Sequence, residues 1–359
     1  MKHASKIQLL VGLLALGLGV TGCTGEAPGG IAPQAGPQPQ GPASAASIRV
    51  ASWNLSEFSH LRSSRAVDKV TRIIWESEFD VVALQEIRDP AAVTRLQDSL
   101  KERTGYDWLS FISERTRRLG PDEHLAFIWN ATKVRALSPA GITIDDPQDK
   151  LAHSPFVAAF RAGEFDFVLV NIHLPRYGRS RTQDILRARQ LEMLNDLYFT
   201  VREASQDEKD IVLLGDFGAD PQHDGWTLHA FDYRPLFSSD RHQSDVRGRG
   251  LSDNIWIHPG YTTEYAGGAK IEAFDENDPD YRQFSGSVDA DPAAREISAH
   301  RPVSALFNTG LPAGDDDVAN YGVLTELNPQ ARKIALTRAP TRHPPGRPPI
   351  HTKPVPEPR

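Results

Sequence analysis

Short apolar runs recur along the middle of the chain, and each is bounded by a polar or charged residue. The run 211–214 is long enough for a buried strand. It is followed by Gly215, which lets the backbone turn, and by Asp216, which would sit at the strand's end. Six further segments of this kind are predicted to be strands, namely 48–54, 80–86, 124–130, 165–173, 253–257 and 302–307.

Between these runs the apolar residues return at helical spacing. Residues 65–79 place them on one stripe, which predicts an amphipathic helix. Asp89 followed by Pro90 has the form of an N-cap and a first helical position, and we expect this helix to reach about Arg103. A longer amphipathic helix is predicted for 182–203. The alternation of strands and helices predicts an α/β fold.

The first 23 residues are typical of a bacterial export signal. Lys2 and Lys6 precede the apolar run 7–20, which is too short to span a bilayer comfortably. The residues up to Cys23 resemble a lipobox, and Cys23 is the only cysteine of the chain. We therefore expect an extracytoplasmic protein, lipid-anchored to a membrane through Cys23. The alternative is an ordinary secretory signal and a secreted protein. A single cysteine forms no internal disulfide, so stability must come from a core.

Composition divides the remainder of the chain into three parts. Residues 24–47 are rich in Gly, Pro, Ala and Gln and predict a flexible linker. Residues 48–310 form the expected domain, which we expect to be monomeric. An extension follows at 311–359, Pro-rich and expected to be disordered from about residue 339. Within the domain the acidic segment 272–291 lacks EF-hand spacing, which favours a solvated loop over a Ca²⁺ site.

Polar residues able to bind metal or transfer protons lie at the ends of the predicted strands. They are Asn54, Glu86, Glu123, His173, Asp216, Asp253 and His300. Each residue alone has a structural explanation, such as a turn cap or a half-buried histidine. It is much less expected that all seven would lie at strand ends by chance. Chemistry in α/β folds collects at one end of a sheet, so these residues predict one site. The formal net charge of −7 means that any nucleic-acid binding must be local.

Six short motifs occur in the order and rough spacing of the endonuclease/exonuclease/phosphatase superfamily, and they resemble deoxyribonuclease I-like proteins most closely. The motifs are Trp53-Asn54, Leu84-Gln85-Glu86-Ile87-Arg88-Asp89, Asn171-Ile172-His173, Gly215-Asp216-Phe217, Ser252-Asp253-Asn254-Ile255 and Ser298-Ala299-His300-Arg301-Pro302-Val303. The resemblance covers about residues 48–307. It implies two β-sheets packed face to face with helices on the outer faces, a four-layer sandwich. It also implies a divalent-metal phosphodiesterase site where loops of the two sheets meet.

The residue types suit that chemistry. A phosphodiester repels hydroxide, so a site needs cationic charge, a base for the attacking water and an acid for the leaving oxygen. Glu86 and Asp216 would hold Mg²⁺, with Mn²⁺ or Ca²⁺ as alternatives, and Asp216 would thereby count among the catalytic residues as well. Asn54 would offer a neutral oxygen to the metal or orient the phosphate. His173 and His300 are the acid and base candidates because their ordinary pKa suits both tasks.

The resemblance also implies partners for the two histidines. Asp253 would orient His300, and Glu123 would orient His173. Arg88 would lie near Glu86 and could contact a phosphate. These assignments make an extracytoplasmic DNA endonuclease the leading hypothesis. A hydrolase of another phosphoester, such as a phospholipid or a nucleotide, is the alternative within the same fold.

Two positions depart from the pattern of the family. Gly218 stands where the family has Asn, and Ala299 stands where it has Asp, so neither offers a side-chain ligand. Asp220 is close enough in sequence to compensate. Because Mg²⁺ needs few protein ligands, the thinner site does not by itself abolish binding. It leaves open weak activity, another divalent ion, or a catalytically weakened lipoprotein that binds a ligand.

Overall fold

The structure, a computed structural model, contains its helices and strands within one compact unit, Ser44–Arg359. It describes residues 47–116, 122–146, 151–174, 181–205, 208–220, 232–284, 292–310 and 333–335. The predicted export signal with Cys23, the linker up to residue 46 and the Pro-rich segment from residue 339 lie outside the described residues and stay predictions. No helix in the described part of the chain is long and apolar enough to cross a membrane.

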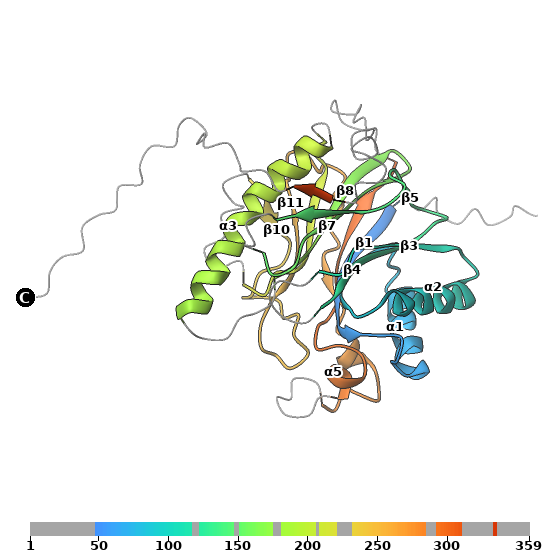
Figure 1. Ribbon diagram of the computed structural model, residues 1–359. Coiled ribbons are helices and arrows are strands. Elements are labelled where there is room, and N and C mark those ends of the chain that lie inside the picture. The colour runs from blue at the N-terminus through green and yellow to red at the C-terminus, as the bar shows by residue number, and fades with distance from the viewer. Residues whose placement is uncertain are drawn as a thin grey trace, which may run out of the picture. The chain divides into compact units, whose positions relative to one another are not determined.

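The strands form two mixed sheets (Figure 1). The first sheet has the order β12 (Lys270–Ile271), β13 (Val303–Asn308), β1 (Ser47–Phe58), β2 (Val81–Ile87), β4 (His124–Asn130) and β3 (Trp108–Ile112). The second has the order β10 (Arg234–Pro235), β11 (Asp253–Ile257), β9 (Ile211–Asp216), β8 (Phe165–His173), β7 (Phe156–Ala162), β6 (Ile142–Asp145) and β14 (Lys333–Ala335), with β5 (Arg135–Ala136) paired to β7. The pairs β1–β2, β8–β9 and β14–β6 are parallel, and the other pairs are antiparallel.

Helices cover the outer faces of both sheets (Figure 1). Helices α1 (Ser64–Glu76) and α2 (Pro90–Thr104) pack on the first sheet, and α3 (Arg181–Ala204) packs on the second. Two short helices, α4 (Phe274–Asn277) and α5 (Pro292–Glu296), add apolar side chains to the α1/α2 side. Helices, sheet, sheet and helix make four layers, so the predicted four-layer sandwich is confirmed.

Three apolar clusters hold the layers together. One lies between the sheets, one between α3 and the second sheet, and one, the helix-side cluster, between α1/α2 and the first sheet. Strand β1 shows how one strand serves two of them. Ile48 and Val50 face the second sheet, whereas Ala51 and Trp53 belong to the helix-side cluster, because successive side chains of a strand point to opposite faces. Burial on both faces explains why these strands read as continuous apolar runs.

The caps of the predicted helices follow from their sequences. Ser63 caps α1 by accepting from the amide of Ala66, and Asp89 caps α2 ahead of Pro90. The prediction that the first helix continues to residue 79 is wrong, since α1 ends at Glu76. Beyond that point the backbone takes a positive φ at residue 78, which stops the helix.

The acidic segment, which the structure describes as far as residue 284, is only in part the solvated loop that was predicted. Asp275 is fully buried and accepts two hydrogen bonds, of 2.7 and 2.8 Å, from the guanidinium of Arg301. Asp278 is nearly buried and accepts from Lys69 at 3.0 Å. Asp275 and Asp278 are therefore partners of cationic side chains, whereas Glu276 and Asp280 are about half exposed. Asp275 anchors the residue next to His300.

Candidate active site

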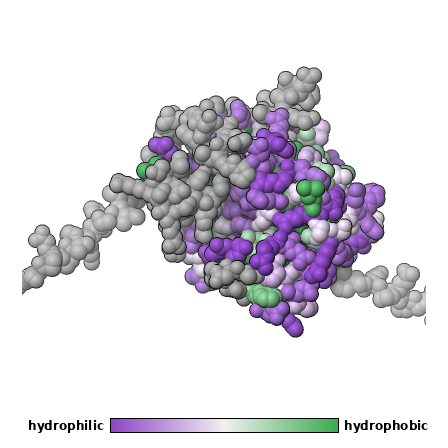
Figure 2. Space-filling view, turned by 60° about the horizontal axis from the view of Figure 1, so that its bottom comes forward, coloured by the Kyte–Doolittle hydropathy of each residue, from purple (hydrophilic) through white to green (hydrophobic). Residues whose placement is uncertain are grey.

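The predicted site residues meet at one edge of the sandwich. Strands β2, β8 and β9 end there, and strands β4, β11 and β13, which run antiparallel to their neighbours, begin there. The turned view in Figure 2 brings the lower end of Figure 1 forward and shows a mainly hydrophilic face. A cavity of about 340 Å³ opens at this edge. It is lined by Glu86, His173, Asp216, Asp245, Arg249, Gly250, Ser252 and His300.

An amide joins the two carboxylates that were expected to hold a metal. The side-chain nitrogen of Asn54 donates to Glu86 Oε1 and to Asp216 Oδ2, each at 3.0 Å. Its oxygen accepts from the amide of Ser56 at 2.9 Å. In this arrangement Asn54 positions the carboxylates and its oxygen is already engaged. Its predicted roles toward metal and phosphate stay predictions.

The expectation that Asn54 ends its strand is wrong, because β1 continues to Phe58. The backbone bulges between these two residues, where Ser56 and Glu57 take positive φ angles. Glu86 on the neighbouring strand also has a positive φ, of 58°. Non-glycine residues rarely adopt this conformation, which costs about 1–3 kcal/mol. The two bulges place Asn54 and Glu86 within hydrogen-bonding distance of each other, and Glu86 lines the cavity.

His173 forms a buried pair with Glu123. Its Nδ1 lies 2.6 Å from Glu123 Oε1, and the two side chains are only 5% and 2% exposed. Nε2 points toward the cavity, 3.9 Å from Glu86 Oε1 and 3.8 Å from Asp216 Oδ2. Burial alone would lower the pKa of His173, but the carboxylate of Glu123, with those of Asp216 and Glu86 nearby, raises it to about 9. His173 is therefore a cation at neutral pH.

His300 forms the equivalent pair with Asp253. The distance from His300 Nδ1 to Asp253 Oδ2 is 2.9 Å, and the same nitrogen is 3.7 Å from Asp216 Oδ2. Burial opposes the charge on this imidazole as well, but Asp253 and Asp216 raise the pKa of His300 to about 10. The backbone holds the ring in place, since the carbonyl of His300 accepts from the indole of Trp53 at 2.8 Å.

Glycine at two positions shapes the strand that carries Asp216. A Cβ on Gly215 would lie 1.9 Å from the carbonyl oxygen of Ile172, so only glycine allows β8 and β9 to approach this closely. Gly218 has a φ of 59°, and its amide donates to Asp216 Oδ1 at 2.8 Å. Ala299, the other departure from the family pattern, packs its methyl group against the helix-side cluster.

Arg88 lies away from the cavity lining. Its guanidinium donates to the carbonyl of Asp122 at 2.7 Å and forms an ion pair with Glu57. Sequence reasoning missed Arg249, which does line the cavity and lies 3.5 Å from Asp245. The sequence feature that could have indicated Arg249 is the alternation of arginine and glycine at 247–250, just before the Ser252-Asp253 motif.

Sequence reasoning also missed His153. This imidazole is buried and lies parallel to that of His173, with ring centroids 4.9 Å apart. Its Nδ1 is 3.6 Å from Glu123 Oε1 and 3.4 Å from the hydroxyl of Thr116. Burial, together with the charge on His173, lowers the pKa of His153 to about 4, so it is neutral beside a charged partner. Its signal was a histidine before the apolar run 156–162, which the sequence analysis did not identify as a strand.

The donor set fits a hard divalent cation. Glu86 and Asp216 present carboxylate oxygens toward the same cavity and share the amide of Asn54. Among the residues that the structure describes, two groups of side chains could also hold an ion by distance alone: Glu123 with His153 and His173, and Asp216 with Asp253 and His300. In both groups a histidine already binds a carboxylate, and imidazole suits zinc better than magnesium. The oxygen pair is the better match for Mg²⁺.

Comparison with known proteins agrees with this geometry. Residues 51–267 match the model of the Endonuclease/Exonuclease/phosphatase family. A protein of Thioalkalivibrio sp. (strain K90mix) named Deoxyribonuclease is 30% identical over 272 residues, which cover 74% of this chain and 72% of the relative. The human Endonuclease/exonuclease/phosphatase family domain-containing protein 1 is 24% identical over 235 residues, 58% of this chain and 41% of the human protein. The crystal structure of truncated Caenorhabditis elegans TDP2 has a similar fold, with a TM-score of 0.50 at 14% identity, over 73% of this chain and 98% of that chain.

Proposed function

The chain belongs to the endonuclease/exonuclease/phosphatase family of phosphoester hydrolases, and on this premise we propose that it is a divalent-metal-dependent phosphodiesterase that cleaves DNA outside the cytoplasm. The observation that carries the proposal is the pair of histidine–carboxylate couples that face one cavity beside Glu86 and Asp216. The relative named Deoxyribonuclease supports DNA as the substrate.

Glu86 and Asp216 would hold the cation, which supplies positive charge to the non-bridging oxygens of the phosphate when it is bound. The chain supplies the remaining groups. Arg249 lies on the cavity wall with a half-exposed side chain and can approach a second phosphate of the strand. This contact fits a polymeric substrate, whose successive phosphates lie on both sides of the bond that is cleaved.

The two imidazoles supply the proton transfers. In the described structure the pKa values of His173 and His300 are both raised, to about 9 and about 10. The charges of Glu86 and Asp216 contribute to both shifts, so their neutralisation lowers both pKa values. One imidazole can then accept the proton of the attacking water, while the other, still protonated, donates to the leaving oxygen.

The test offers plasmid DNA, a chromogenic phosphodiester and sphingomyelin to protein lacking residues 1–46, each with Mg²⁺, Mn²⁺ or Ca²⁺. We expect DNA cleavage that requires a divalent ion and that falls about 10²–10⁴-fold in His173→Ala and in His300→Ala. His258→Ala is the matched control, because this imidazole follows the far end of β11. Wild-type rates in both active-site variants would refute the assignment, and hydrolysis of sphingomyelin alone would move the substrate to a phospholipid.

A further inference from the structure

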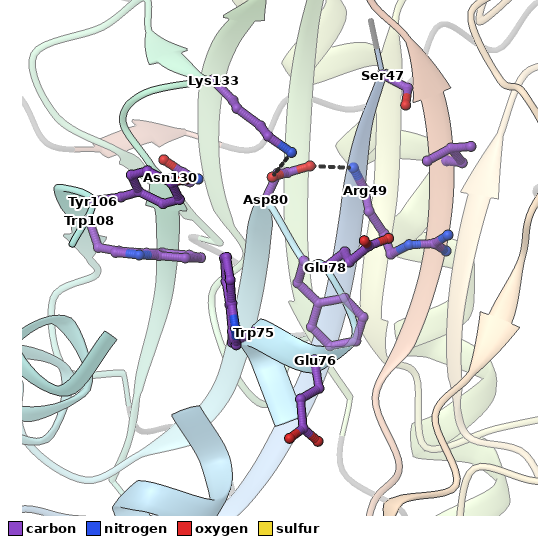
Figure 3. A pocket seen from close by; sticks show the side chains of 12 residues that line it. Ser47, Arg49, Trp75, Glu76, Glu78, Asp80, Tyr106, Trp108, Asn130 and Lys133 are labelled. Atoms are coloured by element: carbon purple, nitrogen blue, oxygen red, sulfur yellow. Dashed lines mark hydrogen bonds and ion pairs between the residues drawn. The ribbon is translucent and has the colours of Figure 1, made fainter. Parts of the chain in front are cut away.

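Figure 3 shows a second cavity, of about 490 Å³. It lies at the opposite end of the first sheet from the active site. Ser47 and Arg49, at the start of β1, line it, whereas Asn54 further along β1 belongs to the active site. Residues 47 and 54 of one strand are about 23 Å apart, at the usual rise of 3.3 Å per residue. A ligand in this cavity would not touch the catalytic groups.

Aromatic rings form one wall of the second cavity. Trp75, at the end of α1, and Tyr106, after α2, are each 42% exposed, and their ring centroids are 6.2 Å apart at an angle of 58°. Trp108 lies beside them at the start of β3. In Figure 3 the rings of Tyr106 and Trp108 lie on one side of Trp75, and Glu78 lies on the other. Exposed aromatic side chains that converge on a cavity are typical of a binding surface.

The polar lining of this cavity contains three carboxylates against the two cationic side chains of Arg49 and Lys133. The guanidinium of Arg49 donates to the carbonyl of Gly268 at 3.1 Å. Asp80 is satisfied, since it accepts from Lys133 at 2.9 Å and from the amide of Arg49 at 3.0 Å. Glu76 and Glu78 also line the cavity, and among the residues that the structure describes neither has an ion-pair partner. The second cavity therefore offers aromatic faces next to free carboxylates, which suits a ligand that is both apolar and cationic.

The chain contains a segment with this chemistry. Eight of the 21 residues in 339–359 are proline, and the segment carries four Arg or Lys residues against one Glu. Proline-rich sequences favour the polyproline II helix, which has three residues per turn. Arg342, Pro345 and Pro348 follow one another at intervals of three, so a polyproline II helix places all three on one side. Aromatic grooves bind proline-rich segments in this conformation.

We propose that the second cavity binds residues 339–359 of the same chain. Pro345 and Pro348 pack against Trp75 and Tyr106, and Arg342 reaches the free carboxylates at the cavity's edge. The length of the segment permits this: 21 residues of polyproline II extend about 65 Å. A domain of this size is only about 45 Å across, and the described strand β14 ends at residue 335, four residues before the segment begins.

The experiment measures binding of a fluorescein-labelled peptide of residues 339–359 by fluorescence anisotropy. The protein is the full chain carrying Pro345→Ser and Pro348→Ser, so that its own segment no longer competes. We expect saturable binding that weakens at least about tenfold when the same two substitutions are placed in the peptide, because truncating a central contact typically costs this much. The wild-type chain should bind the peptide more weakly than the substituted chain.

Variants of the cavity locate the binding. Trp75→Ala and Tyr106→Ala should each weaken binding about tenfold, with Trp75→Phe intermediate. Glu76→Gln with Glu78→Gln should weaken it about threefold and reduce its dependence on salt. Leu109→Ala is the matched control, because this side chain is 49% exposed and lies outside the cavity lining.

Two results would overturn the proposal. One is equal affinity for the natural and serine-substituted peptides, or unchanged binding in folded Trp75→Ala and Trp75→Phe. The other concerns which copy supplies the segment. Competition by the wild-type chain's own segment should be independent of protein concentration. Competition that appears only together with dimers in sedimentation would replace binding within one chain by exchange between two copies.

Discussion

Replacing Glu123 by Gln should separate the electrostatic role of the His173–Glu123 pair from its packing role. Gln has nearly the same shape as Glu but carries no charge. In the wild-type protein the carboxylate is what holds a proton on a 5% exposed imidazole. Without this carboxylate the pKa of His173 falls, because only the charges of Asp216 and Glu86 then oppose the effect of burial.

The size of the effect follows from the pKa of the imidazole. A pKa raised from 6.5 in the unfolded chain to about 9 in the folded protein contributes about 3 kcal/mol to stability. Because the folded pKa of His173 is the higher one, this contribution is fully present below pH 6.5 and is lost as the pH rises through about 9. Asp216 and Glu86 supply part of this shift and remain in the variant, so Glu123→Gln should lower the free energy of unfolding by at most about 3 kcal/mol at pH 6. At pH 9.5 the loss should be only about 1 kcal/mol, from the neutral hydrogen bond that the substitution weakens.

Urea unfolding at the two pH values, with EDTA present, measures this difference directly. Activity supplies a second readout, since the variant loses the carboxylate that pairs with Nδ1 of His173 and should lose about 10²–10⁴ in rate. Glu102→Gln, at an exposed position of α2, is the matched control and should change neither quantity. A loss of stability that is the same at pH 6 and pH 9.5 would show that His173 is not charged in the folded protein and would refute the reasoning.

Four further substitutions test other parts of the chain. Gly215→Ala should destabilise the protein by about 3 kcal/mol or prevent folding, because its Cβ would collide with the backbone of Ile172; the urea midpoint reports this, and a wild-type midpoint would contradict the close approach of β8 and β9. Gly218→Asn should lower the Mg²⁺ concentration for half-maximal DNA cleavage, since Asn tolerates the positive φ and adds an amide near the metal carboxylates. Ala299→Asp should instead destabilise by about 1–2 kcal/mol, because its side chain faces an apolar cluster. Cys23→Ser should move the protein from the membrane fraction to the soluble fraction, and unchanged fractionation would mean that another feature anchors it.

The fold could be predicted because its strands are buried on both faces. The run 211–214 is wholly apolar and the run 167–170 is too, and each is followed by residues that meet at the site, Asp216 and His173. The strands at 108–112 and 142–145 were missed, because they are short and carry mixed polarity. Their place in the sheets is decided by pairing with β4 and β7, which no local pattern reports.

Sequence motifs predicted only those residues of the site that belong to a motif. The pairs His173–Glu123 and His300–Asp253 are brought together as the family resemblance implied, although 50 and 47 residues separate the partners. His153 belongs to no motif, and its place beside His173 follows from the packing of β7 on β8. The same limit explains the acidic segment, where buried cations from distant elements decide which carboxylates leave the solvent.

Asn171 gives the active site a dependence on how the two sheets are joined. This buried amide of β8 accepts from Gln85 of the other sheet at 2.8 Å and donates to the carbonyls of Leu84 and Ala126 at 3.0 Å. Both histidine couples also cross from one sheet to the other. If the two sheets moved slightly apart, each histidine would therefore be separated from its carboxylate, while the hydrogen bonds within each sheet would stay intact. During gradual denaturation, activity should be lost before circular dichroism detects any loss of strands. The rate of turnover is then the most sensitive measure of the contact between the two sheets.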